Sequence, residues 1–490
     1  MKKFFAFAFA LMMLFFSFSS ALAASKKDPA PTAEPIPQPT LSPDAPEYDK
    51  EHPENLSADQ LYALSAVLMT QDKGEVIFEK DPDEIRYPAS MTKILTVLLA
   101  LKIADDLNET VVVSENAVNV PPDSSTMYLK AGEEIRLIDV IYGTMLLSAN
   151  DGANVIAEHI SGDIPRFVDL MNTTAQTMGC TSTHFVNPHG YHDDNHYSTA
   201  RDIAIIAREA MNNEVFREIV RTTTYQIPRT NKQRSRTITT KTEYMLPGSE
   251  DSPNKYYYEF ATGIKTGSHS HSGYCFAGAA AKDGVELISV VMFTGRKARW
   301  ADTIKLMDYG FSQYVSVSPV DLYNMHPITV ETLNYSTADT NNGEITLTCI
   351  PKGEDVQIVT TKSDVRRMAD NLTRVFNIEF TRGELRAPIQ AGEEIGTLSY
   401  RDDKGFIYEY SLTASRSVER RENAPKSLDE IIAETNADPN PFPPFSFELA
   451  IVLFGPPLFL IGIIAVFVIH HKKRGAHKMR APRPVNRYVK

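Results

Sequence analysis

The 490-residue chain is poor in cysteine, with only Cys180, Cys275 and Cys349. An exported protein that depends on disulfides usually carries more cysteines, in an even number. We therefore interpret all three as small buried apolar residues, with one disulfide between two of them as the alternative. The sequence also lacks a Cys-x-x-Cys pair and a His-Glu-x-x-His motif. It therefore predicts no metal site and no cofactor.

Positive charge is scarce in the body of the chain as well. The formal net charge is −12 at pH 7, and no stripe of lysine and arginine crosses the sequence before its C-terminal end. Nucleic-acid-binding domains need such a basic surface, so the composition argues against nucleic acid as a partner. Hydrophobic residues make up 42% of the chain. At this length, that content is enough for a large core and more than one domain.

Residues 1–23 have the pattern of a secretory signal peptide. A cationic start at 1–3 is followed by an apolar stretch over 4–18 and a small-residue cleavage site at 21–23. The alternative is an uncleaved anchor. We therefore expect the mature protein to act outside the cytoplasm. Residues 24–55 are rich in Pro, Ala, Ser and charge and predict a disordered linker.

Residues 56–315 predict an α+β domain. Short apolar runs bounded by turn residues predict strands near both ends of this region, at 64–69, 75–78, 263–267, 274–277 and 287–293. Helices are expected between these two groups of strands, and a last helix over about 300–311. Because strands occur at both ends, we expect the N- and C-terminal strands to share one antiparallel sheet.

The sequence changes character after this domain. Residues 316–418 alternate apolar and polar positions and predict a small all-β domain, to which we assign no chemistry. Residues 419–444 are polar and proline-rich and predict a second linker. Residues 445–469 are almost wholly apolar and predict a transmembrane helix, and 470–490 form a basic tail typical of a cytoplasmic end. A Gly-Pro-Pro sequence within the apolar segment favours a kink, or a re-entrant or interfacial segment instead.

The stretch Ser90-Met91-Thr92-Lys93 is the first candidate for a catalytic centre. Pro88 precedes it and an apolar run over 94–101 follows it, so the serine should lie in the opening turn of a buried helix. Residues three apart on a helix share a face, which brings the Lys93 amine within reach of the Ser90 hydroxyl. A lysine buried among leucines has a lowered pKa and can take the serine proton. By itself, Ser-x-x-Lys also occurs by chance on solvated helix faces.

Two further motifs strengthen this hypothesis. Ser148-Ala149-Asn150 follows a predicted helix over 139–147, where a hydroxyl can relay a proton and an amide can hold a substrate carbonyl or the lysine. Lys265-Thr266-Gly267 lies on a predicted strand, whose edge can bind an extended peptide while the lysine and threonine hold a carboxylate. The glycine would let the substrate backbone come close.

In this order, Ser-x-x-Lys, Ser-x-Asn and Lys-Thr-Gly are shared by penicillin-binding proteins and class A β-lactamases. The chain resembles the D-alanyl-D-alanine carboxypeptidases, the low-molecular-mass penicillin-binding proteins, over about 61–314 and more weakly through the all-β domain. Further stretches that resemble this family are 87–93, 184–190 and 196–202. The resemblance implies a β-lactamase/transpeptidase-like catalytic domain, an antiparallel sheet packed with helices.

The resemblance also implies a role for each matching residue. Ser90 is expected to be the acylated nucleophile and Lys93 its activating base, and Ser148 and Asn150 would shuttle the proton and hold the substrate. The residues expected to bind the substrate are Lys265, Thr266, Gly267, Ser268 and Arg299, with Arg296 as the alternative to Arg299. The backbone N–H groups of Ser90 and Ser268 would form the oxyanion hole.

The implied activity is that of a serine-type carboxypeptidase. It would remove the terminal D-alanine from peptidoglycan stem peptides through an acyl-enzyme on Ser90, and β-lactams would acylate the same serine. The predicted location is the cell membrane, single-pass, with the catalytic domain on the extracytoplasmic side. The alternatives are a peptidoglycan endopeptidase and a non-catalytic β-lactam-sensing or wall-binding protein. A β-lactamase is disfavoured, because residues 181–190 contain no Glu or Asp to serve as the deacylating glutamate of class A enzymes.

Two features depart from the family pattern. Ala149 stands where the family usually has glycine, which is a small change. Residues 268–272 include His269 and His271, for which the resemblance implies no role. We interpret these histidines as part of a flexible surface loop, in preference to a metal site.

Overall fold

The structure is a computed structural model that describes residues 39–425, 428, 431–433, 459–466 and 468. The described residues form two compact units. The larger unit contains the described residues up to His326, together with Pro351–Asn377 and Ser399–Glu409. The smaller unit contains Pro327–Ile350, Ile378–Leu398 and the described residues from Tyr410 on.

Several predicted segments fall wholly or partly outside the described residues. They are the signal peptide at 1–23, part of the linker at 24–55, and parts or all of 419–444, 445–469 and 470–490. Within the predicted membrane segment, residues 459–466 are helical and their large apolar side chains are exposed. Across the described part of the chain, no helix combines the length and the apolar character that a membrane crossing requires.

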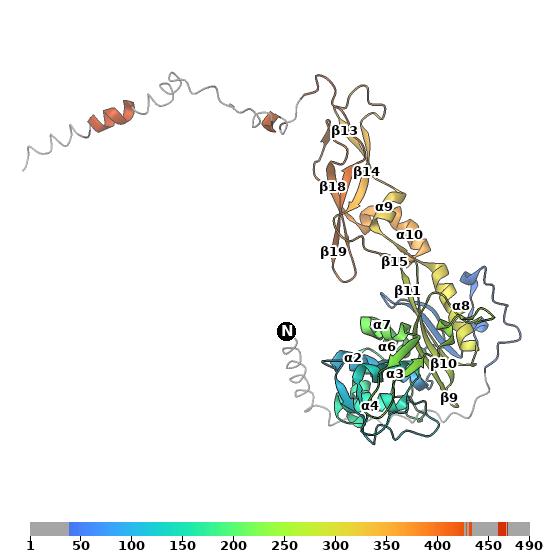
Figure 1. The fold of residues 1–490 in the computed structure, drawn as a ribbon. Helices are drawn as coiled ribbons and strands as arrows, with labels where there is room; N and C mark the ends of the chain where they lie inside the picture. Colours follow the sequence, from blue (N-terminus) through green and yellow to red (C-terminus); the bar gives the residue numbers. More distant parts are fainter. Residues whose placement is uncertain (1–38, 426–427, 429–430, 434–458, 467, 469–490) are drawn as a thin grey trace, which may run out of the picture. The chain divides into compact units, whose positions relative to one another are not determined.

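A five-stranded antiparallel sheet organises the larger unit (Figure 1). Its strand order is β2-β1-β11-β10-β9, so the N-terminal hairpin pairs directly with β11. The strands are β1 Ser65–Thr70, β2 Val76–Lys80, β9 Ala261–His269, β10 Gly273–Lys282 and β11 Val285–Thr294. The prediction that strands from both ends of this region share one antiparallel sheet is confirmed.

Helices cover both faces of this sheet. Along β1, Val67 and Met69 belong to one buried apolar cluster and Ala66 and Leu68 to another, because successive strand residues point to opposite faces. The first cluster packs against the helices that lie between β2 and β9 in the sequence, and the second packs against α8 with its buried Trp300. The helices are α2 Lys93–Ile103, α3 Leu137–Leu146, α4 Asn150–Ser161, α5 Ile164–Thr177, α6 Ala200–Met211, α7 Glu214–Arg221 and α8 Ala298–Gln313.

Small two-stranded sheets and side-chain caps fix the connections of the larger unit. α5, α6 and α7 begin after Asp163, Thr199 and Asn213, whose side chains each accept a backbone N–H of the first helical turn. The small sheets pair β3 Thr110–Val112 with β4 Glu134–Arg136, β5 Thr224–Ile227 with β6 Arg236–Thr239, and β7 Gly248–Ser249 with β8 Ser252–Pro253.

Ser90 lies just outside the α-helix in which it was predicted. Residues Ala89–Thr92 form a 3-10 turn, η3, and α2 begins at Lys93. The Thr92 hydroxyl holds this turn, since it donates to the Ala89 carbonyl at 2.8 Å and contacts His196 Nε2 at 2.8 Å. Pro88 signals a helix start, but the tightening of the first turn depends on His196, which is distant in sequence.

The smaller unit is built mainly on a six-stranded sheet of order β16-β18-β19-β14-β13-β17. Along β14, Ile345, Leu347 and Cys349 are buried while the residues between them are exposed, as the sequence alternation predicts. The strands are β13 Thr329–Leu333, β14 Glu344–Pro351, β16 Asn377–Phe380, β17 Leu385–Arg386, β18 Glu394–Arg401 and β19 Ile407–Ala414.

The prediction of an all-β domain over 316–418 is wrong in part. This region also contains α9 Pro319–Met325, α10 Lys362–Ala369 and α11 Leu372–Val375, and its strand β15 Ile358–Thr361 pairs with β12 Tyr314–Val317 in the larger unit. A capping box between Ser318 and Asp321 begins α9, and the Thr361 hydroxyl caps α10. These helices are too short for the apolar periodicity by which a helix is detected in sequence.

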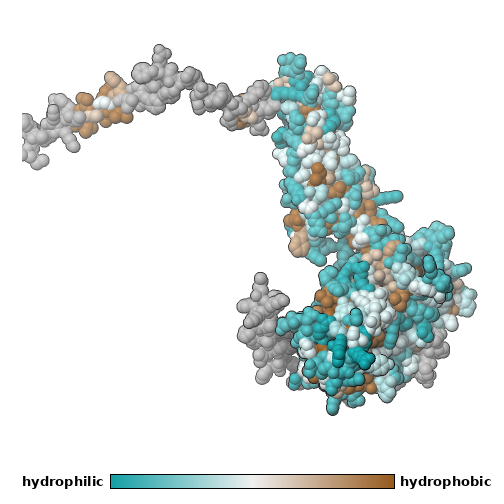
Figure 2. All heavy atoms as spheres, in the orientation of Figure 1, coloured by the Kyte–Doolittle hydropathy of each residue, from teal (hydrophilic) through white to brown (hydrophobic). Residues whose placement is uncertain are grey.

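The three cysteines are free and buried, so the alternative of a disulfide is wrong. Burial raises the pKa of the Cys180 thiol to about 12 and that of Cys275 to about 11, which leaves both protonated at neutral pH. On the face drawn in Figure 2, hydrophilic residues predominate over both units and hydrophobic ones occur in small groups. This distribution is expected where the apolar side chains are buried in the interior.

The segment over 184–199 crosses the Ser90 turn. Isolated β-bridges join His184 to Tyr197 and Arg86 to Ser198. Gly190, within the segment, has φ +78°, and a Cβ atom there would lie 1.8 Å from the Ala89 carbonyl oxygen. Only glycine therefore lets this segment pack against the turn.

Replacing Gly190 by alanine should destabilise the larger unit more than replacing Gly179. Both glycines have a positive φ, but no described atom lies within 4 Å of the Cβ position at Gly179. Backbone strain should cost about 1–2 kcal/mol in either variant, and the collision should add about 1–3 kcal/mol in Gly190→Ala alone. Urea unfolding followed by fluorescence of Trp300, the only tryptophan, measures both. Equal stability of the two variants would contradict the packing argument.

Candidate active site

The Ser90 hydroxyl and the Lys93 amine are in hydrogen-bond contact. Lys93 Nζ lies 2.9 Å from Ser90 Oγ, so the three-residue spacing brings the two side chains together as predicted. Lys93 is fully buried at the start of α2, whereas Ser90 is only partly buried. The hydroxyl is therefore open to a substrate, and the amine is shielded from water.

Lys93 faces three hydrogen-bond acceptors. Besides Ser90 Oγ, they are Asn150 Oδ1 at 2.8 Å and the His189 carbonyl oxygen at 2.6 Å. Burial lowers the pKa of Lys93 well below its ordinary value, and the charge of Lys265 lowers it further. A lysine in such an environment becomes neutral, and thus a base, at a much lower pH than in water.

The junction of α3 and α4 carries the second motif. Asn150, the first residue of α4, contacts Lys93 through Oδ1 and donates from Nδ2 to Ser124 Oγ at 3.0 Å. Ser148 is buried with φ +63°, in the left-handed region that non-glycine residues rarely adopt. Among the described hydrogen bonds, none joins the Ser148 hydroxyl to Ser90 or Lys93. The structure thus connects Asn150 directly to Lys93 and, through Lys93, to Ser90. Ser148 precedes Asn150 by two residues in the chain.

The stretch at 184–190 encloses Lys93. The Pro188 carbonyl accepts from Thr96 Oγ1 at 2.6 Å, and Asn187 Oδ1 accepts from the Gly190 N–H at 2.7 Å. These two contacts, one on each side of His189, hold its carbonyl oxygen against Lys93. The backbone of this stretch therefore supplies one of the three acceptors of the amine.

A buried histidine supports the turn that carries Ser90. His196 Nδ1 accepts the Val186 N–H at 3.2 Å, so its Nε2 carries the proton and donates to Thr92 Oγ1. Burial lowers the pKa of His196 to about 3, which keeps the imidazole neutral. His196 thus positions the turn through Thr92, and none of the described hydrogen bonds joins it to Ser90.

Strand β9 places the Lys-Thr-Gly motif against η3. A Cβ atom on Gly267 would lie 2.7 Å from the Pro88 carbonyl oxygen, so this glycine is needed for the strand to approach the Ser90 turn. From the sequence, Gly267 was expected to make room for the substrate backbone, and its close approach to Pro88 was not predicted. Thr266 is partly buried, and Ser268 is exposed and pairs with Tyr274 of β10.

Lys265 lies near two other cations, Lys241 and Arg299, whose charges affect its pKa. Its side chain is buried, and Nζ donates to the Thr266 carbonyl at 3.0 Å. Burial lowers the pKa of Lys265 to about 7, and the charges of Lys241 and Arg299 add to the effect. In the described part of the chain, no carboxylate forms a salt bridge with any of these three residues. Such an arrangement favours an anionic ligand.

Of the two predicted arginines, Arg299 contacts β10, the strand that pairs with β9. Its guanidinium lies 5.2 Å from the ring centre of Tyr274, which pairs with Ser268 across the sheet. Burial lowers the pKa of Arg299 to about 10, and no described atom accepts a hydrogen bond from its Nε. Arg296 is exposed in the connection between β11 and α8. The geometry therefore favours Arg299 as a carboxylate ligand.

Sequence reasoning missed three contributors to this site. They are Ser124, Lys241 and the His189 carbonyl, and none belongs to a motif with chemical meaning in sequence. Lys241 Nζ lies 3.4 Å from Ser125 Oγ, so it reaches the loop that also carries Ser124. The stretch at 184–190 was noticed by resemblance alone, since a backbone carbonyl leaves no side-chain signal.

This arrangement suits acyl transfer. The partly exposed Ser90 contacts the buried amine of Lys93, and the edge strand β9 lies beside them. Cations that form no salt bridge in the described part of the chain lie near this edge. Such a site can attack the carbonyl of an extended peptide that ends in a carboxylate close to the reacting bond.

Family profiles match two parts of the chain. Residues 52–295 match the profile of the family described as D-alanyl-D-alanine carboxypeptidase. Residues 346–420 match the profile of the penicillin-binding protein 5 C-terminal domain. Among solved structures, this chain is similar to penicillin-binding protein 5 from Haemophilus influenzae, with 27% identity and a TM-score of 0.49. The similarity covers 75% of this chain and 100% of the other chain.

Two curated relatives cover most of the chain. The D-alanyl-D-alanine carboxypeptidase DacF of Bacillus subtilis is 30% identical over 371 residues, which is 73% of this chain and 86% of the relative. The D-alanyl-D-alanine carboxypeptidase DacA of Haemophilus influenzae is 30% identical over 374 residues, again 73% and 86%. On this evidence and on the geometry of its Ser-Lys site, the chain belongs to the D-alanyl-D-alanine carboxypeptidase family.

Proposed function

We propose that the chain releases the terminal D-alanine of peptidoglycan stem peptides through an acyl-enzyme on Ser90. The observation that carries this proposal is the 2.9 Å contact between Ser90 Oγ and the fully buried Lys93 Nζ. Membership of the carboxypeptidase family supports the reaction class. The cations near β9, which form no salt bridge among the described residues, support a substrate that ends in a carboxylate.

The hydrogen-bond pattern of Lys93 explains how it would act as a base. A neutral amine has two N–H groups and one lone pair. If the N–H groups donate to Asn150 Oδ1 and the His189 carbonyl, the lone pair is left to accept the Ser90 hydroxyl proton. After the transfer, the ammonium donates to all three neighbours, so the charged state is also satisfied.

In the acylation step, Ser90 Oγ bonds to the carbonyl carbon between the two D-alanines. The C–N bond then breaks, and the serine proton reaches the leaving amine by way of Lys93, with Ser148 as the proposed relay. The backbone N–H groups of Ser90 and Ser268 would stabilise the developing oxyanion. Lys265, Thr266 and Arg299 would hold the terminal carboxylate. Water then cleaves the ester and restores the Ser90 hydroxyl.

A β-lactam would acylate Ser90 by the same attack, with ring opening in place of loss of D-alanine. The stretch at 184–190, which contains no acidic residue, lies against Lys93. No glutamate is therefore available there to activate water, and the penicilloyl ester should turn over slowly.

One prediction from this mechanism concerns the nucleophile. A stem pentapeptide ending in D-Ala-D-Ala, incubated with the protein, should lose one alanine by mass spectrometry. Ser90→Ala should lower this rate by about 10³-fold or more and abolish covalent labelling by penicillin. Ser161→Ala, at the end of α4, serves as the matched control and should behave like the wild type. Cleavage of cross-linked dimers with no loss of D-alanine from the pentapeptide would favour an endopeptidase.

Another prediction concerns pH. Because the pKa of Lys265 is about 7, its cation is present below pH 7 and is lost above it in the free enzyme. If the cation holds the substrate carboxylate, kcat/KM should fall as pH rises through about 7. Lys265→Arg keeps the charge and should move this falling limb to higher pH, even if the maximum is reduced. If kcat/KM of Lys265→Arg fell at the same pH as that of the wild type, the titration of Lys265 would not be the cause of the decrease.

We also propose that the protein is exported and anchored in the cell membrane by residues 445–469, with the catalytic unit outside the cytoplasm. The support comes from sequence: the signal-peptide pattern at 1–23, the apolar character of 445–469 and the basic residues over 470–490. Peptidoglycan substrates also lie outside the cytoplasm. The exposed apolar side chains of residues 459–466 fit burial in lipid.

Deletion of residues 445–490 tests this anchor. The full chain should sediment with membranes and resist alkaline carbonate, whereas the shortened chain should be released in soluble form. Penicillin labelling of Ser90 in both forms controls for folding. Recovery of the shortened chain in the carbonate-resistant membrane fraction would show that the anchor lies elsewhere.

A further inference from the structure

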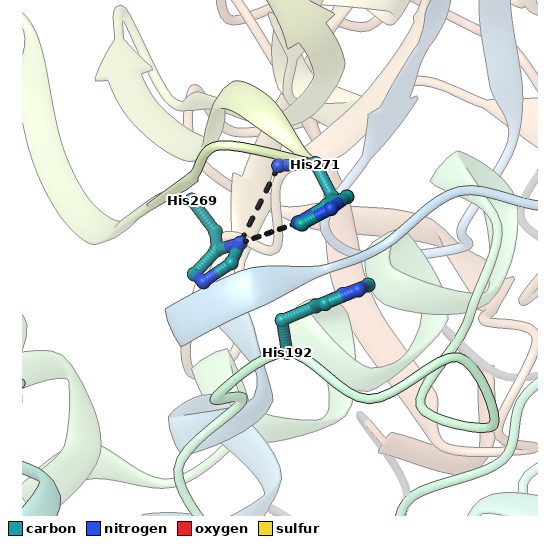
Figure 3. A group of neighbouring side chains, drawn as sticks. All are labelled: His192, His269 and His271. Carbon is teal, nitrogen blue, oxygen red and sulfur yellow. Dashed lines mark hydrogen bonds between the residues drawn. The ribbon is translucent and has the colours of Figure 1, made fainter. Parts of the chain in front are cut away.

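Three histidines from two distant segments meet beside the Ser-Lys site. His269 ends β9, one residue after Ser268, and His271 lies in the turn that leads into β10. His192 comes from the loop that follows His189 and Gly190. Figure 3 shows the three imidazoles side by side, and their potential ligand atoms all lie within 4.8 Å of one another. The expectation that His269 and His271 belong to a flexible surface loop does not account for this packing.

The spacing of two of these imidazoles suits a shared metal ion. His269 Nδ1 and His271 Nδ1 are in hydrogen-bond contact at 3.3 Å, and Ser270 Oγ lies 3.3 Å from the first and 3.2 Å from the second. A bound ion would replace these contacts. In tetrahedral coordination with Zn–N bonds of about 2.0–2.1 Å, two ligand nitrogens lie about 3.4 Å apart. The observed separation is thus close to one edge of a tetrahedral site.

His192 has a free ligand atom and a partner that would orient it. Its Nδ1 is buried and, among the described residues, has no hydrogen-bond partner. Its Nε2 faces the Asp194 carboxylate at 3.5 Å. Metal-bound histidines usually donate their second ring N–H to such a carboxylate, which fixes the tautomer and the ring orientation. A buried nitrogen without a partner calls for an explanation, and a metal ion supplies one.

The rings of His192 and His271 are stacked, with centres 4.0 Å apart. Binding therefore requires a ring rotation about the Cβ–Cγ bond, a torsion with a broad range.

We propose that His192, His269 and His271 bind a late first-row divalent cation, with Zn²⁺ as the best match and water as a fourth ligand. Three imidazole donors suit Zn²⁺, Cu²⁺ or Ni²⁺ and do not suit Mg²⁺ or Ca²⁺, which require oxygen ligands. The ion would clamp the loop after Gly190 to the turn after the Lys-Thr-Gly strand, at one side of the substrate site. The proposal does not depend on the chemistry of Ser90, so Ser90→Ala should bind the same ion.

The test is a zinc titration of the full-length protein, stripped with a chelator and competed against a chromogenic zinc indicator. The basic tail contains His470, His471 and His477. All measurements are therefore made in a background where these three are alanine. One Zn²⁺ per chain is expected. His271→Ala and His192→Ala should weaken binding tenfold or more, and His271→Cys should retain it because thiolate is also a zinc ligand.

His326→Ala is the matched control, since His326 is an exposed histidine paired with Asp370 elsewhere in the larger unit. It should bind zinc as tightly as the background protein does. Penicillin labelling of Ser90 shows that each variant is folded. In addition, zinc should raise the melting temperature of the background protein and leave that of His271→Ala unchanged. Absence of stoichiometric binding in the background protein, or equal affinity in His271→Ala, would overturn the proposal.

Discussion

The burial of the Lys93 amine is the constraint on which the rest of the catalytic unit depends. In water a lysine is protonated and useless as a base, so the fold must remove water and still satisfy the amine in both protonation states. Three acceptors from three segments meet this need: Ser90 from η3, Asn150 from the start of α4, and the His189 carbonyl from the 184–199 segment. Each segment is fixed by its own contacts, and the absence of a side chain at Gly190 allows the last one to lie against η3. A shift of any of the three would admit water or leave the amine unpaired.

The antiparallel sheet brings together parts of the site that are far apart in the chain. β1 pairs with β11, and β9 occupies the edge next to η3. This edge carries Lys265 and Thr266, while α8 brings Arg299 against β10. The protein as a whole is acidic, with a formal charge of −12, yet no described salt bridge neutralises these cations. These cations therefore favour an anionic ligand at the site, although the chain as a whole is acidic.

Part of this architecture could be predicted from the chain alone. The shared sheet followed from strands at both ends of the catalytic region, and the Ser90–Lys93 contact followed from their spacing. The 3-10 turn at Ser90 could not be predicted, because His196 stabilises it through Thr92 from a distance of about a hundred residues. The helices α9, α10 and α11 were missed because each is too short for a periodic signal. The capping residues of α9 and α10 can be read in the sequence. A capping residue indicates where a helix starts only when the residues after it show the apolar periodicity of a helix.

By itself, the sequence determined the nucleophile motif, the sharing of one antiparallel sheet by the N- and C-terminal strands, and the family to which the chain belongs. These features depend on local periodicity and on residue types at fixed spacing, which a linear chain retains. Only the tertiary structure decided that a backbone carbonyl completes the surroundings of Lys93, that Lys241 joins Lys265, and that His192 meets His269 and His271. The physical reason is that these contacts join residues from 24 to 96 positions apart. Such proximity arises only when the apolar faces of the sheet and helices are buried together.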